Sequence, residues 1–87
     1  MYELQIEKGV EKDIKDLKKS SAEEFNRVIS HIMDLKDTPR PTGARKIVGS
    51  KNDWRLRIGK YRVIYEIDDR HKVVRIFRVK HRRDAYK

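Results

Sequence analysis

The chain has 87 residues, which is enough for one domain with a modest core and too few for two. It contains no cysteine, which excludes disulfide bonds and thiolate metal sites and fits a reducing compartment. Charged residues make up 43% of the chain, and 23 Lys and Arg against 14 Asp and Glu give a formal net charge of +9. Such an excess of positive charge favours binding to polyanions, so nucleic acid is the leading class of partner.

The basic residues are unevenly distributed, because the segment up to Asp37 is nearly balanced and the excess lies after it. The N-terminus lacks the basic and apolar segments of a secretory signal, and no apolar run approaches membrane-spanning length. We therefore expect a single domain over residues 1–87, a cytoplasmic location and no association with a membrane.

The first half of the chain predicts a strand followed by a helix. Residues 2–6 alternate apolar and polar side chains, which is typical of a short strand with one buried face. Over residues 9–19 the apolar residues Val10, Ile14 and Leu17 recur at spacings of four and three. This period indicates an amphipathic helix.

A second helix is predicted over residues 22–35. Ser20 and Ser21 are each followed three residues later by a glutamate, which is the pattern of a capping box at a helix N-terminus. The apolar stripe of this helix consists of Ala22, Phe25, Val28, Ile29, Ile32, Met33 and Leu35. Pro39 and Pro41 follow, and proline ends a helix because it lacks an amide donor.

Residues 54–67, with the sequence WRLRIGKYRVIYEI, predict a β-hairpin. Gly59 and Lys60 form a two-residue loop of type II′, since glycine accepts the positive φ that the first loop position requires. The loop fixes a register that pairs Ile58 with Tyr61, Arg57 with Arg62, Leu56 with Val63, and Trp54 with Tyr65. These apolar residues share one face, which we expect the two helices to cover.

The opposite face of the hairpin carries Arg55, Arg57 and Arg62. Like charges directly across a strand pair are destabilising by some tenths of a kcal/mol. Because Arg57 faces Arg62, stability alone does not explain this arrangement, whereas an anionic partner would relieve the repulsion.

The remaining segments complete an α+β fold. Residues 44–48 predict a short strand, residues 68–71 a turn, and residues 72–79 another strand. Strict alternation along that last strand places Val73, Arg75, Phe77 and Val79 on one face, and Val74, Ile76 and Arg78 on the other. Both faces are partly apolar, which favours an interior position in the sheet. The order of elements indicates two helices packed on one face of a mainly antiparallel sheet of four to five strands.

No zinc-binding spacing, phosphate-binding loop or nucleophile elbow occurs, and the three histidines are scattered, so we expect neither a metal nor a cofactor. What remains is a basic and aromatic cluster composed of Arg55, Arg57, Arg62, Lys80, His81, Arg82, Arg83 and Tyr86. This composition suits cleavage of RNA by its own 2′-hydroxyl, since fixed guanidinium groups stabilise charge on the phosphate oxygens. Tyr86 is a candidate base, because nearby positive charge favours the phenolate, and His81 or Arg82 is a candidate to support the leaving group. The residues alone leave open a second interpretation, a surface that binds RNA or another partner without cleaving it.

The hairpin at residues 54–67 and the ending VKHRRDAY at residues 79–86, together with the two leading helices, resemble the RelE/ParE superfamily of toxins from type II toxin–antitoxin systems. The chain resembles the RelE branch more than the ParE branch. The resemblance implies the same fold and an endoribonuclease that cuts messenger RNA in the ribosomal A site. The products are a 2′,3′-cyclic phosphate and a 5′-hydroxyl, and no metal takes part.

By position in the family, Arg62 and Arg82 match arginines implicated in transition-state stabilisation, and Tyr86 matches a tyrosine proposed to act on the 2′-hydroxyl. Arg55 and Arg57 match lysines of well-known relatives, so the tunable pKa of lysine is absent here. We expect Arg57, Arg62, Arg82 and Tyr86 to be catalytic, and Arg55, Lys80, His81 and Arg83 to bind RNA.

The resemblance also implies partners: the ribosome, mRNA and a cognate RelB-like antitoxin, with operator DNA bound only through the antitoxin complex. Two alternatives remain at this point. One is a ParE-like inhibitor of DNA gyrase, and the other is a relative without catalytic activity that binds antitoxin and operator.

Overall fold

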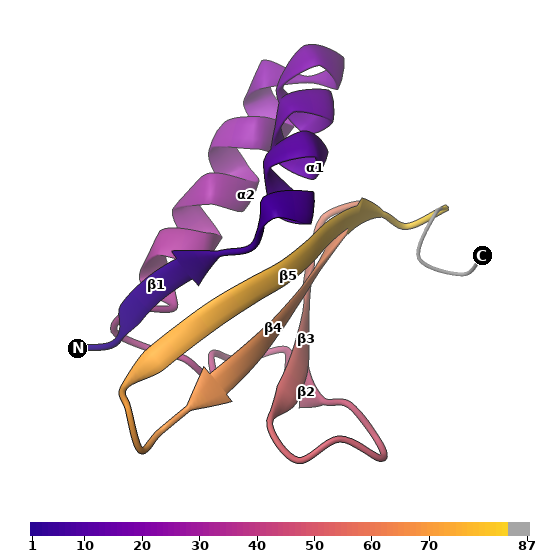
Figure 1. The fold of residues 1–87 in the computed structure, drawn as a ribbon. Helices are drawn as coiled ribbons and strands as arrows, with labels where there is room; N and C mark the ends of the chain where they lie inside the picture. The colour runs from indigo at the N-terminus through magenta and orange to yellow at the C-terminus, as the bar shows by residue number, and fades with distance from the viewer. Residues whose placement is uncertain (84–87) are drawn as a thin grey trace.

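A computed structural model describes residues 1–83 of the chain. Two helices and five strands follow one another in the order β1 (Glu3–Ile6), α1 (Lys8–Ser20), α2 (Ala22–Asp34), β2 (Ala44–Lys46), β3 (Asp53–Ile58), β4 (Tyr61–Asp68) and β5 (Val73–His81). The strands form one sheet with the order β1-β5-β4-β3-β2 (Figure 1). Only the β1–β5 pair is parallel. The predicted α+β class with a mainly antiparallel sheet is confirmed.

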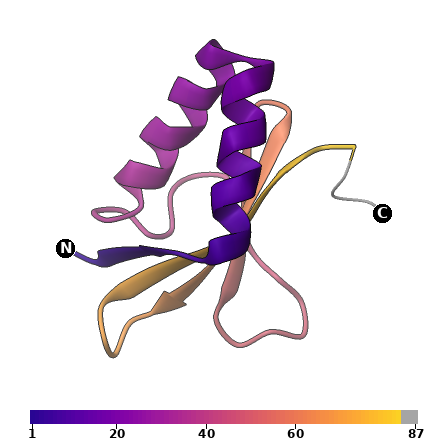
Figure 2. The same cartoon turned by 45° about the horizontal axis from the view of Figure 1, so that its top comes forward.

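Both helices lie on one side of the sheet, and the two views agree on this arrangement (Figures 1 and 2). The predicted capping box is present in part, because the Ser21 hydroxyl accepts a hydrogen bond from the Glu24 amide at 3.2 Å. The core between the layers contains Val10, Leu17, Val28, Ile32, Leu35, Leu56, Ile58, Tyr61, Val63, Tyr65, Ile67, Val74, Ile76 and Val79. No helix within residues 1–83 is both long enough and apolar enough to cross a membrane.

The hairpin of β3 and β4 has the predicted register in all four pairs. Gly59 has a φ of +58°, as the first position of a type II′ loop requires. Leu56 and Ile58 are buried under the helices, whereas Arg55 and Arg57, which alternate with them, are exposed. The alternation of the sequence therefore determines which face of the hairpin enters the core.

Strand β5 departs from strict alternation. Ile64 of β4 is paired with Arg78, but the next residue, Tyr65, is paired with Ile76, so Phe77 is an extra residue in β5. This β-bulge shifts the side-chain order, and Ile76 and Val79 are both buried on the side of the helices. The prediction that Val79 shares a face with Val73 and Arg75 is thus wrong. The predicted interior position of this strand is confirmed, since β5 lies between β1 and β4.

Two residues assigned to apolar faces are exposed. Ile6 at the end of β1 is 43% exposed, because β1 is an edge strand that has β5 on one side only. Met33 is 46% exposed near the end of α2, where Ile32 and Leu35 point into the core instead. A helical stripe read from the sequence is wider than the face that the sheet actually covers.

Candidate nucleic-acid interface

The sheet face away from the helices carries two rows of basic residues that run across the strands. In the first row, Arg57 of β3 is paired with Arg62 of β4. In the second row, Arg45 of β2 is paired with Arg55 of β3. Residues two apart on a strand point to the same face, so Arg55 and Arg57 bring the two rows side by side.

The two rows enclose a hollow of about 380 Å³ that is lined by Gly43, Arg45, Arg55, Arg57 and Arg62. We call it the arginine hollow. The three hairpin arginines predicted to share a face therefore lie together. Arg45 was missed, because a three-residue edge strand with the sequence ARK gives no periodicity from which its face can be predicted.

Arg62 differs from the other arginines of the hollow in its burial. Its relative exposure is 6%, whereas Arg45, Arg55 and Arg57 are exposed. A buried guanidinium loses part of its hydration, so it interacts more strongly with an anion that reaches it. The hollow thus combines one buried cation with three exposed ones, which is suited to binding a phosphate group.

At the opposite end of the same sheet face, basic and acidic side chains are paired. Glu66 of β4 forms an ion pair with Arg75 of β5, and Arg75 also lies 3.5 Å from a carboxylate oxygen of Glu7. Asp53 is paired with Glu66 across β3 and β4. The charge of Arg75 is therefore balanced by acidic neighbours, whereas no acidic residue lines the arginine hollow.

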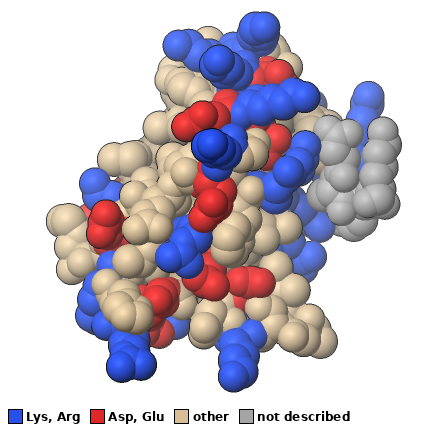
Figure 3. All heavy atoms as spheres, viewed as in Figure 1, with Lys and Arg blue, Asp and Glu red and all other residues tan. Residues whose placement is uncertain are grey.

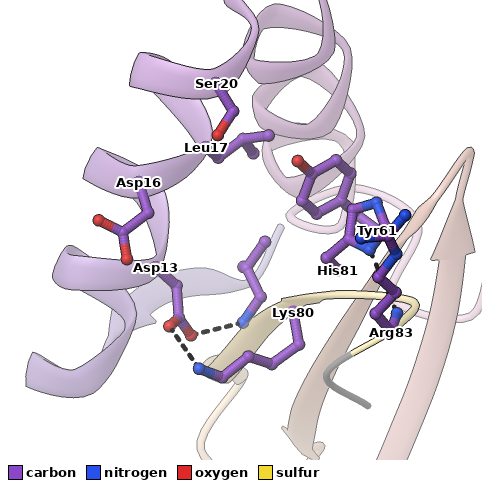
Figure 4. A pocket seen from close by; sticks show the side chains of 9 residues that line it. Asp13, Asp16, Leu17, Ser20, Tyr61, Lys80, His81 and Arg83 are labelled. Atoms are coloured by element: carbon purple, nitrogen blue, oxygen red, sulfur yellow. Dashed lines mark hydrogen bonds and ion pairs between the residues drawn. The ribbon is translucent and has the colours of Figure 1, made fainter. Parts of the chain in front are cut away.

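Lys80, His81 and Arg83 line a different hollow, on the side of the sheet that carries α1. This cleft of about 450 Å³ lies between α1 and the end of β5, and Asp13, Asp16, Leu17, Ser20, Tyr61 and Val79 complete its lining (Figure 4). The rings of Tyr61 and His81 meet edge to face with their centroids 5.2 Å apart. The His81 Nδ1 accepts a hydrogen bond from the Arg83 amide at 3.2 Å.

Asp13 of α1 is the buried anchor of this cleft. Strand β1 pairs with β5 only up to Ile76, so the backbone of β5 beyond that residue has no strand on that side. The Asp13 carboxylate accepts a hydrogen bond from the Val79 amide at 3.0 Å and lies 3.2 Å from the Lys80 ammonium (Figure 4). Asp13 thus replaces the missing strand partner and holds Lys80 against α1.

The remaining tail residues are described in part. The Arg82 amide donates a hydrogen bond to the Lys60 carbonyl at 2.7 Å, and both residues line a shallow hollow of about 260 Å³ with His81 and Arg83. Tyr86, the predicted base, lies outside the described residues. The structure therefore groups the hairpin arginines in one place and Lys80, His81 and Arg83 in another.

The face of the molecule that carries α1 and β1 has acidic and basic side chains intermixed (Figure 3). Basic side chains from the last turn of α1, Lys18 and Lys19, occur in the same helix as Glu11 and Asp16. The arginine hollow is a better candidate for an anion site, because each side chain that lines it is a cation and the fifth residue is a glycine.

Comparison with known proteins supports the same family from sequence and from structure. Residues 4–86 match the family described as "ParE toxin of type II toxin-antitoxin system, parDE". A protein of Methanocaldococcus jannaschii named "Putative toxin RelE1" is 36% identical over 91 residues, which cover 99% of this chain and 96% of that protein.

Two solved structures share the fold. A chain of the archaeal RelE–RelB complex from Pyrococcus horikoshii matches with a TM-score of 0.80 and 29% identity, over 93% of this chain and 94% of that chain. A chain of the toxin–antitoxin complex RelBE2 from Mycobacterium tuberculosis matches with a TM-score of 0.77 and 26% identity, over 92% and 96% of the two chains. Because the matches cover nearly the whole chain, we conclude that this protein belongs to the RelE/ParE superfamily of toxins from type II toxin–antitoxin systems.

Proposed function

We propose that this toxin is a ribosome-dependent endoribonuclease that cuts messenger RNA in the ribosomal A site and thereby inhibits translation. The observation that carries the proposal is the arginine hollow, in which the buried Arg62 lies beside Arg45, Arg55 and Arg57. Similarity to proteins named RelE supports the assignment to that branch.

The reaction assigns the arginines a chemical role. The ribose 2′-oxygen attacks the adjacent phosphorus and the bond from phosphorus to the 5′-oxygen breaks, which leaves a 2′,3′-cyclic phosphate and a 5′-hydroxyl. Negative charge accumulates on the nonbridging oxygens in the transition state. Arg62 and Arg57 stabilise that charge through hydrogen bonds from their guanidinium groups, and Arg55 binds a neighbouring phosphate. The toxin itself needs no metal ion at the scissile phosphate, since these groups supply the positive charge.

The proton of the 2′-hydroxyl needs an acceptor. None of the described residues that line the arginine hollow is a base at neutral pH, because they are four arginines and a glycine. We assign this role to Tyr86, and we assign support of the leaving oxygen to Arg82. A cation-rich site without a histidine or carboxylate base depends strongly on how the RNA is positioned, which is consistent with a requirement for the ribosome.

The basic residues around the α1–β5 cleft are assigned to binding. Lys80, His81 and Arg83 contact RNA outside the scissile nucleotide, since they lie near the end of β5 rather than in the arginine hollow. Lys80 contributes less than an unpaired lysine would, because Asp13 already neutralises part of its charge.

A cognate RelB-like antitoxin is the proposed protein partner. The solved structures at 29% and 26% identity are both described as toxin–antitoxin complexes. Operator DNA would bind through that complex rather than through the toxin alone.

Expression in a bacterial host without an antitoxin tests this proposal. The wild-type chain should arrest growth, and mapping of 5′-hydroxyl ends should locate cuts within translated codons. Arg62→Ala, Arg57→Ala and Tyr86→Phe should each reduce both effects. Arg75→Ala is the matched control, since this arginine lies on the same sheet face but is held by Glu66.

Two outcomes would contradict the proposal. Growth arrest with intact transcripts, accompanied by a DNA-damage response and co-purification of gyrase, would favour the gyrase inhibitor, which the ParE description of the matched family keeps in view. Full antitoxin binding with no arrest in the wild type would identify a relative without catalytic activity.

A further inference from the structure

We infer that Arg40, which nothing in the reaction requires, is a positioning residue: it fixes the connection between α2 and β2 so that Arg45 stands in the wall of the arginine hollow. This inference rests on the proposed role of the hollow in RNA binding. The structural observation is a set of contacts that holds residues 39 and 40 to three different parts of the fold.

Arg40 makes contacts on two sides. One guanidinium nitrogen lies 2.8 Å from a carboxylate oxygen of Asp69 in the turn between β4 and β5, and a second lies 3.4 Å from the other oxygen. The guanidinium carbon lies 5.3 Å from the centre of the Trp54 ring in β3. A fork-like pair combined with stacking on an aromatic ring fixes both the position and the plane of the guanidinium.

The neighbours of Arg40 are held as well. Asp69 accepts a third hydrogen bond from the hydroxyl of Tyr2, the residue directly before β1. The Tyr65 hydroxyl, at the end of a fully buried side chain, donates to the Pro39 carbonyl at 2.7 Å. Hydrogen bonds from Arg40 and Tyr2 keep the pKa of Asp69 below its ordinary value, so the carboxylate is charged at neutral pH.

These contacts matter for β2 because that strand has little else to position it. It has three residues, it is paired only with β3, and it lies at the edge of the sheet. The Ala44 amide donates to the Pro41 carbonyl at 3.0 Å, so the turn after Arg40 leads directly into β2. Gly43 and Arg45, three and five residues after Arg40, both line the arginine hollow.

The contacts of Arg40 are too exposed to decide the stability of the fold. The side chains of Arg40 and Asp69 are 44% and 56% exposed, and ion pairs of this kind contribute little to the free energy of unfolding. Loss of Arg40 should therefore affect the hollow more than the global stability.

The test measures binding of a fluorescein-labelled single-stranded RNA hexanucleotide by the full chain, over a range of salt concentrations. Arg45→Ala should weaken binding about tenfold and reduce the slope of log K against log salt by about 0.7, as expected for one phosphate contact to a single strand. Arg40→Ala should produce the same reduction of the slope, although Arg40 does not line the hollow.

The double variant Arg40→Ala with Arg45→Ala distinguishes positioning from a direct contact. If Arg40 acts through Arg45, the double variant should bind no more weakly than Arg45→Ala alone. Additive losses would overturn the inference, because Arg40 would then contact RNA itself or act elsewhere. Arg70→Ala, one residue after Asp69 and exposed, controls for the loss of one positive charge.

Two further results complete the test. Asp69→Asn keeps the size of the side chain and should reproduce part of the effect of Arg40→Ala, so the inference stays testable if Arg40→Ala folds poorly. If Arg45→Ala binds RNA like the wild type, Arg45 does not contribute to RNA binding, and both the role of the hollow at this position and the positioning inference fail. An Arg45→Ala defect combined with wild-type behaviour of Arg40→Ala and Asp69→Asn would overturn only the positioning inference.

Discussion

At the scale of single residues, Asp13 shows how one buried carboxylate substitutes for a strand. Asp13→Ala should destabilise the fold by about 1–3 kcal/mol, because the Val79 amide loses its acceptor at a buried position. Asp13→Asn should cost less, since its amide oxygen can still accept that bond. Urea unfolding measures the free energy of unfolding of both variants. Asp16→Ala is the control, because Asp16 lies three residues further along α1 and is exposed. Equal effects of the Ala and Asn variants would mean that the charge, and not the hydrogen bond, is what matters.

Tyr65 gives a pH-dependent prediction. Burial raises its pKa from 10.0 to about 12, and the positive charge of Arg40 opposes this shift in part. Below pH 10 the hydroxyl is neutral in both states and its contribution to stability is fully present. Above that pH the unfolded state loses the proton first, so the free energy of unfolding should fall as the pH rises toward about 12.

Comparison of the wild type with Tyr65→Phe isolates this contribution. At neutral pH the variant should be less stable by about 1 kcal/mol, because the Pro39 carbonyl loses its donor. The difference between the two proteins in urea unfolding should shrink above about pH 10. A constant difference across that range would show that the tyrosine titrates alike in both states.

At the scale of elements, two glycines should respond to alanine in opposite directions. Gly59 in the hairpin loop has a φ of +58°, so Gly59→Ala should destabilise the fold by about 1–2 kcal/mol. Gly9 lies in the first turn of α1, where an added Cβ would lie 3.5 Å from an Arg78 side-chain nitrogen, an ordinary van der Waals contact. Gly9→Ala should therefore stabilise by about 0.5–1 kcal/mol. Thermal unfolding measures both changes, and a neutral Gly59→Ala would refute the type II′ assignment.

At the scale of the whole molecule, the net charge of +9 is less informative than its distribution. Positive charge on the open sheet face is concentrated in the arginine hollow, whereas Arg75 at the other end is paired with Glu66. Arg55→Ala should reduce the salt slope of single-stranded RNA binding by about 0.7, and Arg75→Ala should leave it nearly unchanged. Equal reductions would indicate binding by overall charge instead of by the hollow.

The elements and the register of the hairpin were predictable because local rules decide them. The alternation from Trp54 to Ile58, the glycine at the loop and the apolar spacing of Val10 and Leu17 each depend on residues close in sequence. The face that carries Arg55, Arg57 and Arg62 follows from the same alternation, so this part of the candidate site was visible without a structure.

Other features depended on contacts between distant segments. The bulge at Phe77 changes which side chains of β5 share a face, and the sequence of that strand does not indicate where a bulge occurs. Arg45 lies in the arginine hollow because β2 pairs with β3. Lys80 contacts Asp13 because β1 ends before β5 does, which leaves room for α1 beside the end of β5.

The sequence by itself determined the α+β class, the two helices, the hairpin with its arginine face, and the resemblance to the RelE/ParE toxins, because periodicity and turn chemistry are local. Only the tertiary structure decided that Arg62 is buried, that Arg45 completes the hollow, and that His81 lies on the side of α1. The physical reason is that burial and proximity across a sheet depend on strand order and on the extra residue in β5, which are set by packing of the whole chain.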